Sequence, residues 1–131
     1  MAYNIKDMSG FVLNRYRWQN RILMVLTDDE TIASRQKDIL DQDIDGVLDR
    51  DLVVFGLGGE GPPYLEDTDV DLNRVRDGLS LEDDDKIVLL GKDGAVKGKW
   101  RTPVTTDELF TLIDAMPMRK EEMRRKRMNK S

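Results

Sequence analysis

The sequence predicts an α/β fold with a central mixed sheet and flanking helices, in the order βαβ and then ββα. Two observations lead to this prediction: apolar runs of strand length alternate with segments of helical periodicity, and an Asp-Gly pair separates the last two runs. With 131 residues, 39% of them hydrophobic, the chain suits one domain around a single core.

The first half of the chain predicts a βαβ unit. Residues 21–26 (RILMVL) form an apolar run between polar residues, which is typical of a strand buried on both faces. From Asp29, apolar residues keep helical spacing as far as Leu48, with Asp or Thr available to cap the start. Residues 51–57 (DLVVFGL) are a second strand-like run. This order strongly favours parallel strands joined by a right-handed crossover.

The second half predicts a hairpin and a closing helix. Within an acidic connector, residues 70–79 suit a short helix. Asp93-Gly94 separates two strand-like runs and favours a type I′ turn, which needs positive φ at both central positions. Thr105 or Thr106 then caps a helix that ends before Pro117. The apolar stripe of that helix consists of Leu109, Leu112, Ile113 and Met116.

The charge is unevenly distributed between a body and a tail. Residues 119–131 hold seven Lys/Arg against two Glu, a charge of +5, which leaves −10 for residues 1–118 because the whole chain carries −5. We therefore expect a folded domain over residues 1–118 and a basic tail over residues 119–131. The candidate polyanion-binding residues are Arg119, Lys120, Arg124, Arg125, Lys126, Arg127 and Lys130.

Two interpretations of this tail remain open. Its cations suit phosphate, a sulfated glycan or an anionic membrane surface, but a frayed, solubilising helix also explains them. The tail has no aromatic residue for base stacking and the body is acidic, which argues against nucleic acid as a partner. Tyr16, Trp18, Trp100 and Phe110 are expected to pack around the hairpin, and no ligand role is assigned to either Trp.

Composition excludes several classes of chemistry. The chain has no cysteine and no histidine, which removes disulfides, thiolate nucleophiles, the usual structural zinc sites and a histidine base. It has no apolar run of about 18 residues and no apolar leader. The chain as written predicts a cytoplasmic protein, and a periplasmic or secreted one if a precursor has been trimmed.

Two acidic series resemble calcium loops. Asp41-x-Asp43-x-Asp45-Gly46 matches the first half of an EF-hand loop, but Leu52 occupies position 12, where a bidentate Glu is needed. Because the neighbouring apolar residues continue a helical stripe, a helix end is favoured. In Asp67-x-Asp69-x-Asp71-x-Asn73, Leu72 and Gly78 replace the required Gly and Glu, which favours a solvated acidic loop over a loosely held divalent cation.

A glycine motif follows the second strand. Gly56-x-Gly58-x-x-Gly61 matches the dinucleotide-binding fingerprint, which requires a helix directly behind it to bind the pyrophosphate. Pro62, Pro63 and an acidic stretch follow instead. The glycines are therefore expected to form a tight turn at the exit of the strand.

The predicted order of elements is the thioredoxin-like arrangement. The segments YRWQNRILMVL, DRDLVVFGL, LLGKDGAVK and ELFTLIDAMPMRKEEMRR, within residues 9–125, resemble the DUDES domain, a family of unknown function found in bacterial proteins and in vertebrate matrix and sushi-repeat proteins. The resemblance implies a fold related to peroxiredoxin and thioredoxin, and no known reaction.

Thiol chemistry on such a fold needs a cysteine where the first strand ends and the helix begins. Residues 27–31 (TDDET) contain none, and the proline that usually precedes the third core strand is absent from residues 79–90. The sequence therefore favours a non-catalytic thioredoxin-like domain that binds a protein or polyanionic partner and needs no cofactor. The alternative is a carboxylate-based, divalent-metal-dependent hydrolase.

Overall fold

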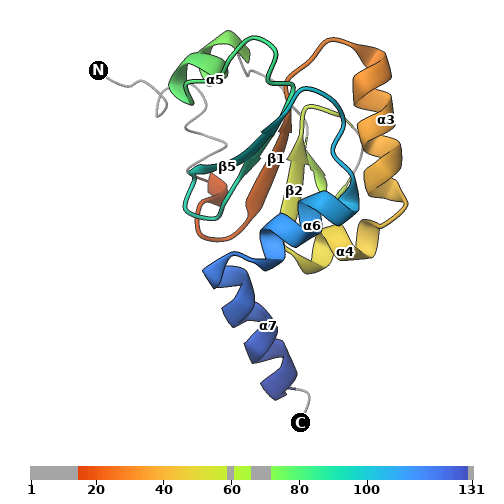
Figure 1. Ribbon diagram of the computed structural model, residues 1–131. Helices are drawn as coiled ribbons and strands as arrows, with labels where there is room; N and C mark the ends of the chain where they lie inside the picture. The colour runs from red at the N-terminus through yellow and green to blue at the C-terminus, as the bar shows by residue number, and fades with distance from the viewer. Residues whose placement is uncertain (1–14, 59–60, 66–71, 130–131) are drawn as a thin grey trace.

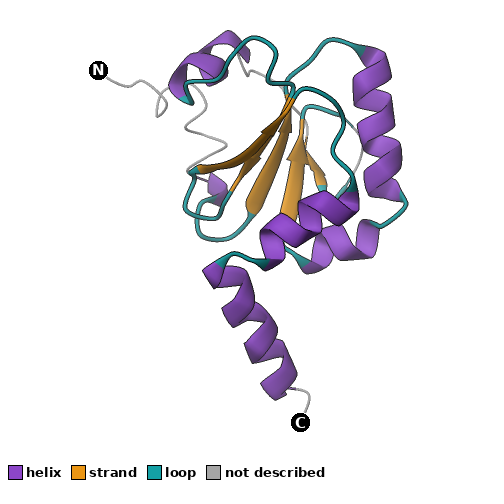
Figure 2. Cartoon of the chain, viewed as in Figure 1, coloured by secondary structure: helices purple, strands orange, loops and turns teal. Residues whose placement is uncertain are grey.

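A five-stranded mixed sheet forms the centre of the computed structural model, which describes residues 15–58, 61–65 and 72–129 (Figure 1). The strand order is β3-β2-β1-β4-β5, and helices cover both faces of the sheet (Figure 2). The strands are β1 (Arg21–Val25), β2 (Leu52–Phe55), β3 (Tyr64–Leu65), β4 (Ile87–Leu90) and β5 (Val96–Trp100). The helices are α3 (Glu30–Asp41), α4 (Ile44–Asp49), α5 (Leu72–Gly78), α6 (Thr106–Asp114) and α7 (Pro117–Asn129).

The central strand is β1, whose five residues are all buried. It pairs in parallel with β2 and antiparallel with β4, so the predicted mixed sheet is confirmed. Because β1 is buried on both faces, its side chains enter two cores. Leu23 and Val25 pack in the core that includes residues of α3, α4 and α6, while Ile22 and Met24 pack in the core that includes Val75 of α5.

The helix predicted from Asp29 is two helices. Asp29 caps α3 as expected, but the backbone of Asp43 (φ −141°, ψ 45°) breaks the helix before α4. After this break Val47 is buried and Leu48 is 43% exposed, so the prediction that Leu48 belongs to the apolar stripe is wrong. Asp41 and Asp43 lie at a helix end and a helix start, which confirms the favoured interpretation of the first acidic series.

The predicted hairpin forms, but its turn is not type I′. The N–H of Gly94 donates to the carbonyl oxygen of Gly91 (2.9 Å), and within the turn only Gly94 has positive φ (86°). A turn followed by one left-handed residue is the usual three-residue hairpin loop, which needs a glycine at a single position. Asp93 contributes instead by accepting a hydrogen bond from the N–H of Ala95 (3.0 Å).

Helix α6 follows its sequence signals closely. The Thr105 side chain caps it by accepting a hydrogen bond from the N–H of Glu108 (3.2 Å). Leu109 and Ile113 are buried, and the predicted stripe is completed by partly buried hydrophobic residues at its edge. Pro117 then begins α7, where a missing backbone N–H has no hydrogen bond to lose.

The aromatic residues divide into packed and exposed ones. Trp100 and Phe110 pack against one core, and Tyr16 packs against the other, as expected. Trp18 lies beside the hairpin as expected, but it is 62% exposed and therefore does not pack in a core. Its backbone N–H, rather than its indole, joins it to the hairpin by donating to the carbonyl oxygen of Lys92 (2.6 Å).

The glycine motif is a strand exit, as expected. Gly56 has φ +100°, and a Cβ placed on it would overlap the carbonyl oxygen of Val25 in β1. After Gly61 and two prolines the chain enters β3, a strand, where a dinucleotide site needs the start of a helix. Gly56 therefore allows close approach of two neighbouring backbones.

Replacing Gly56 by Ala should lower the free energy of unfolding by about 3 kcal/mol or more, because both positive φ and overlap with Val25 oppose the new methyl group. Gly58→Ala is the matched control, because Gly58 also has positive φ (69°) but open space around it. The Gly58→Ala substitution should lower the free energy of unfolding by about 1–2 kcal/mol. Urea denaturation measures both, and equal losses would contradict the role given to the close approach.

Candidate functional site

The end of β1 lies beside a cavity of about 530 Å³. This is the region where thiol chemistry on a thioredoxin-like fold needs a cysteine. The lining residues are Leu26, Thr27, Asp28, Asp29, Asn73, Arg76, Asp83 and Lys86. The wall is thus polar and mixed in charge, with no sulfur atom and no histidine.

A carboxylate occupies the position where a thiolate would be stabilised. Oδ1 of Asp29 accepts hydrogen bonds from the N–H of Thr31 (2.9 Å) and of Ile32 (3.4 Å) at the start of α3. The Thr27 hydroxyl in turn accepts one from the N–H of Asp29 (3.0 Å). The first N–H groups of a helix would stabilise a nearby thiolate. Here two of them already bind the Asp29 carboxylate.

The two cations of this cavity are bound to backbone oxygens. Arg76 donates to the carbonyl oxygens of Leu26 (2.5 Å), Glu82 (2.8 Å) and Asp85 (2.7 Å), and it thereby ties α5 to the end of β1. Lys86 donates to the carbonyl oxygen of Asp83 (3.1 Å). These contacts give both side chains a structural role in shaping the cavity.

The carboxylates of the first acidic series do not converge. Asp41 accepts hydrogen bonds from Lys37 (2.8 Å) and from the Tyr64 hydroxyl, which hold its pKa below the usual value. Asp43 and Asp45 are exposed. Among residues 15–58, 61–65 and 72–129, no group of three or more Asp or Glu could hold a metal ion. Most of the second series, residues 67–71, lies outside the described residues.

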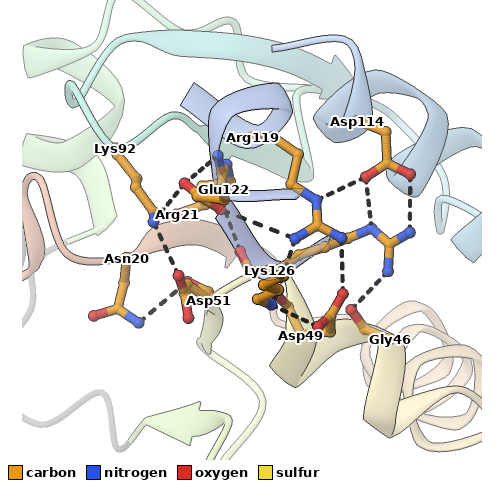
Figure 3. A network of polar contacts seen from close by, with 11 residues as sticks. Asn20, Arg21, Gly46, Asp49, Asp51, Lys92, Asp114, Arg119, Glu122 and Lys126 are labelled. Atoms are coloured by element: carbon orange, nitrogen blue, oxygen red, sulfur yellow. Dashed lines mark hydrogen bonds and ion pairs between the residues drawn. The ribbon is translucent and has the colours of Figure 1, made fainter. Parts of the chain in front are cut away.

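A second region of interest is the contact between α7 and the body, drawn in Figure 3. Glu122 of α7 accepts two hydrogen bonds from Arg21 (both 3.1 Å) and one from Lys92 (2.7 Å). Both cations are almost fully buried. Arg21 also donates to the carbonyl oxygen of Arg50 (2.9 Å), and Lys92 to Asp51 (2.9 Å). Glu122 therefore joins α7 to the start of the central strand and to the hairpin.

Arg119 makes a second set of contacts on the same side of α7. Its guanidinium pairs with Asp49 (2.8 Å) and with Asp114 (3.0 Å), and only 3% of its side chain is exposed. Asp114 also pairs with Arg50 (2.9 Å), and Asp49 also pairs with Lys126 (2.7 Å). Helices α4, α6 and α7 thus meet through matched charges (Figure 3).

These contacts lower the pKa of the carboxylates involved. Hydrogen bonds from Lys126 and Arg119 lower the pKa of Asp49 to about 2. For Glu122, burial acts to raise the pKa, but the hydrogen bonds from Arg21 and Lys92 outweigh it and hold the pKa below its usual value. The same balance, with Arg50 and Arg119 as donors, lowers the pKa of Asp114.

The predicted polyanion-binding residues are divided by these contacts. Arg119 and Lys126 are bound to the body, whereas the other described candidates, Lys120, Arg124, Arg125 and Arg127, are exposed on other sides of α7. Glu121 pairs with both Arg124 (2.5 Å) and Arg125 (3.5 Å). Lys130 lies outside the described residues. Arg119 is therefore unsuited to the predicted role, because its charge is buried and matched.

The buried ion-pair partners are the residues that sequence reasoning missed. Arg21 stands at the edge of an apolar run and Lys92 in a hairpin turn, where local pattern predicts exposure. Arg21 pairs with a residue 101 positions away, and Arg119 with one 70 positions away. The only local signal of this burial was Arg21 itself, a charged residue at the edge of a strand run that is otherwise apolar.

A comparison with protein-family models finds one that matches residues 12–122, described as "Domain of unknown function (DUF4174)". The chain belongs to this family. No curated protein matches the chain. The family assignment agrees with the expectation of a domain without a known reaction.

Two solved structures resemble this member of the family. The reduced 2-Cys peroxiredoxin of Plasmodium vivax matches with a TM-score of 0.56 and 19% identity, over 83% of this chain and 84% of the other. Thioredoxin peroxidase I of Plasmodium yoelii matches with a TM-score of 0.51 and 17% identity, over 83% and 79%. These likenesses show the fold alone, and they confirm that it is thioredoxin-like.

The fold is thus shared with thiol peroxidases, but the sequence has no cysteine to perform their chemistry. A fold does not confer a reaction when the reacting group is missing. Separately, no helix within the described part of the chain is both long and apolar enough to cross a membrane.

Replacing Glu122 by Gln should lower the free energy of unfolding at neutral pH by about 2–4 kcal/mol, because two buried cations lose their shared carboxylate. The pKa of Glu122 is depressed by folding, so this stabilisation is present above pH about 4.5 and is lost as the pH falls below that value. Urea denaturation at several pH values between 7 and about 2 measures both effects.

Glu121→Gln is the matched control for this substitution, since it removes the same charge from the exposed neighbouring position. Its unfolding midpoint should stay close to that of the unchanged protein. Equal destabilisation by the two substitutions would show that the buried contact has no special role.

Proposed function

We propose that this protein is a non-catalytic thioredoxin-like binding domain without thiol redox activity, and that α7 presents its contact surface. The outward surface of α7, meaning here Lys120, Glu121, Arg124, Arg125 and Arg127, contacts an anionic partner. The partner is a protein or another polyanion. This use of the fold needs no cofactor.

The division of charge on α7 carries the proposal. The cations that face the body, Arg119 and Lys126, are matched by Asp49 and Asp114. The outward surface has four cations against one carboxylate, Glu121. A solubilising helix needs no ion pairs with the body, whereas a binding surface benefits from a fixed support because less conformational freedom is lost when the partner binds.

Two finer assignments stay predictions. The DUDES assignment is the first, because the matching family model is described only as a domain of unknown function. The location, cytoplasmic or else periplasmic or secreted after trimming of a precursor, is the second of these predictions. The alternative hydrolase gains no support from the described carboxylates, which pair with cations or lie apart.

Replacing Lys120, Arg124 and Arg125 together by Gln should weaken binding of poly-L-glutamate or heparin at low salt by about tenfold or more, because surface cations supply most of such affinity. The control is Lys37→Gln, Lys99→Gln and Arg101→Gln, which removes equal charge from exposed positions on other elements. Isothermal titration measures both. Equal weakening by the two triple variants, or no binding by the unchanged protein, would contradict the proposal.

Hydrogen peroxide should be consumed at the rate of buffer alone when the protein is mixed with thioredoxin, thioredoxin reductase and NADPH. The physical reason is that no cysteine is present to attack the peroxide. The measurement is the absorbance of NADPH over time, with a 2-Cys peroxiredoxin as the positive control. Consumption proportional to protein concentration would contradict the absence of redox activity.

A further inference from the structure

A small groove lies beside the start of α7. Its volume is about 270 Å³, and it combines an apolar wall with charged residues of both signs. Trp18, Met116 and Met118 belong to the apolar wall, and the charged residues include Lys92, Lys97 and Asp93, the last two of which pair with each other (3.2 Å). A groove of this size is slightly smaller than a typical small-molecule pocket, and it suits one or two side chains of a peptide.

Two exposed apolar side chains share this groove. Among the described residues, the large hydrophobic side chains with most exposure are Trp18 (62%), Leu48 (43%), Met118 (41%) and Met128 (63%). Trp18 and Met118 line the groove, and Met128 lies on α7. Single exposed apolar residues need no explanation, but a Trp and a Met that share one groove mark a contact site.

The groove is continuous with the cations of α7. Met118 and Arg125 are seven residues apart, which places them on the same side of the helix and about 10 Å from each other along its axis. Arg124 lies next to Arg125, and Glu121 between the groove and these cations binds both of them. One carboxylate shared by two guanidinium groups leaves an excess of positive charge there.

We propose that this groove and the neighbouring arginines bind an extended acidic segment of a protein partner. An apolar side chain of the segment inserts between Trp18 and Met118, and carboxylates about three residues away pair with Arg124 and Arg125, since an extended chain covers about 10 Å in three residues. The inference rests on the proposed function, and it names the class of partner.

Other anionic partners fit these features less well. A sulfated glycan or polyphosphate has no apolar group for the groove. An anionic membrane would use the cations, but α7 has only Met118, Met123 and Met128 among its many charged residues, so it lacks an apolar face to insert. Nucleic acid needs aromatic platforms along the cationic surface, and α7 has none.

The test uses fluorescein-labelled peptides and the full chain, with binding followed by fluorescence anisotropy. One peptide carries Leu and, three residues later, a run of Glu; a second has Ser in place of that Leu. The unchanged protein should bind the Leu peptide about tenfold more tightly, which corresponds to burial of one apolar side chain. In the double variant Trp18→Ser and Met118→Ser, the two peptides should bind with equal affinity.

Charge variants test the second half of the contact. Arg125→Gln should weaken binding of the Leu peptide about fivefold, whereas Lys126→Gln, which removes the same charge from the side that binds Asp49, should change it less than twofold. Glu121→Gln should strengthen binding about two- to fivefold, because it releases Arg124 and Arg125. Circular dichroism melting confirms that each variant folds.

The outcomes separate this inference from the proposed function. Equal affinity of the unchanged protein for both peptides, together with binding of poly-L-glutamate, would overturn the proposed insertion of an apolar side chain into the groove. The proposed binding of an anionic partner would still stand. Binding of neither peptide nor polymer would overturn both. Tighter binding to phosphatidylserine vesicles than to the Leu peptide would overturn the protein segment in favour of a lipid surface.

Discussion

The position of α7 depends on one carboxylate, Glu122, held between Arg21 and Lys92. Taking two cations out of water is unfavourable unless each finds a well-placed anion. Burial of Arg21 and Lys92 therefore requires the Glu122 carboxylate between them. Arg21 begins the central strand and Lys92 lies in the hairpin turn. The same carboxylate thus joins the middle of the sheet, its antiparallel half and the last helix, and it fixes which side of α7 faces solvent.

Fixing that side gives α7 two different surfaces from one cationic sequence. Towards the body its charges are matched by Asp49 and Asp114, and away from the body they are in excess. Helix α7 has little apolar character of its own, so ion pairs rather than burial of an apolar face orient it. The proposed contact surface is therefore a product of tertiary structure, although every residue in it is local in sequence.

The fold could be predicted because its signals are local. Residues 21–26 have the length and apolar character of a buried strand, Thr105 stands three residues before Glu108 as a cap requires, and Asp-Gly marks the hairpin. Details that depend on competing local conformations were missed, such as the helix break at Asp43 and the single left-handed residue, Gly94, in the turn. The sequence also located the basic residues of the candidate site, but not their division between body and solvent. That division depends chiefly on Asp49, which pairs with Arg119 and Lys126, 70 and 77 positions away, and no periodicity reveals such contacts.

The link between Glu122 and Arg21 also has a mechanical consequence. The covalent path from α7 to the sheet runs through α6 and residues 101–105 to β5, whereas the ion pair connects α7 directly to the first residue of β1. A partner that pulls on α7 therefore loads the strand that is hydrogen-bonded on both sides, in parallel to β2 and antiparallel to β4. The same force also reaches β5 through α6, so α7 is connected to the sheet at two separate strands.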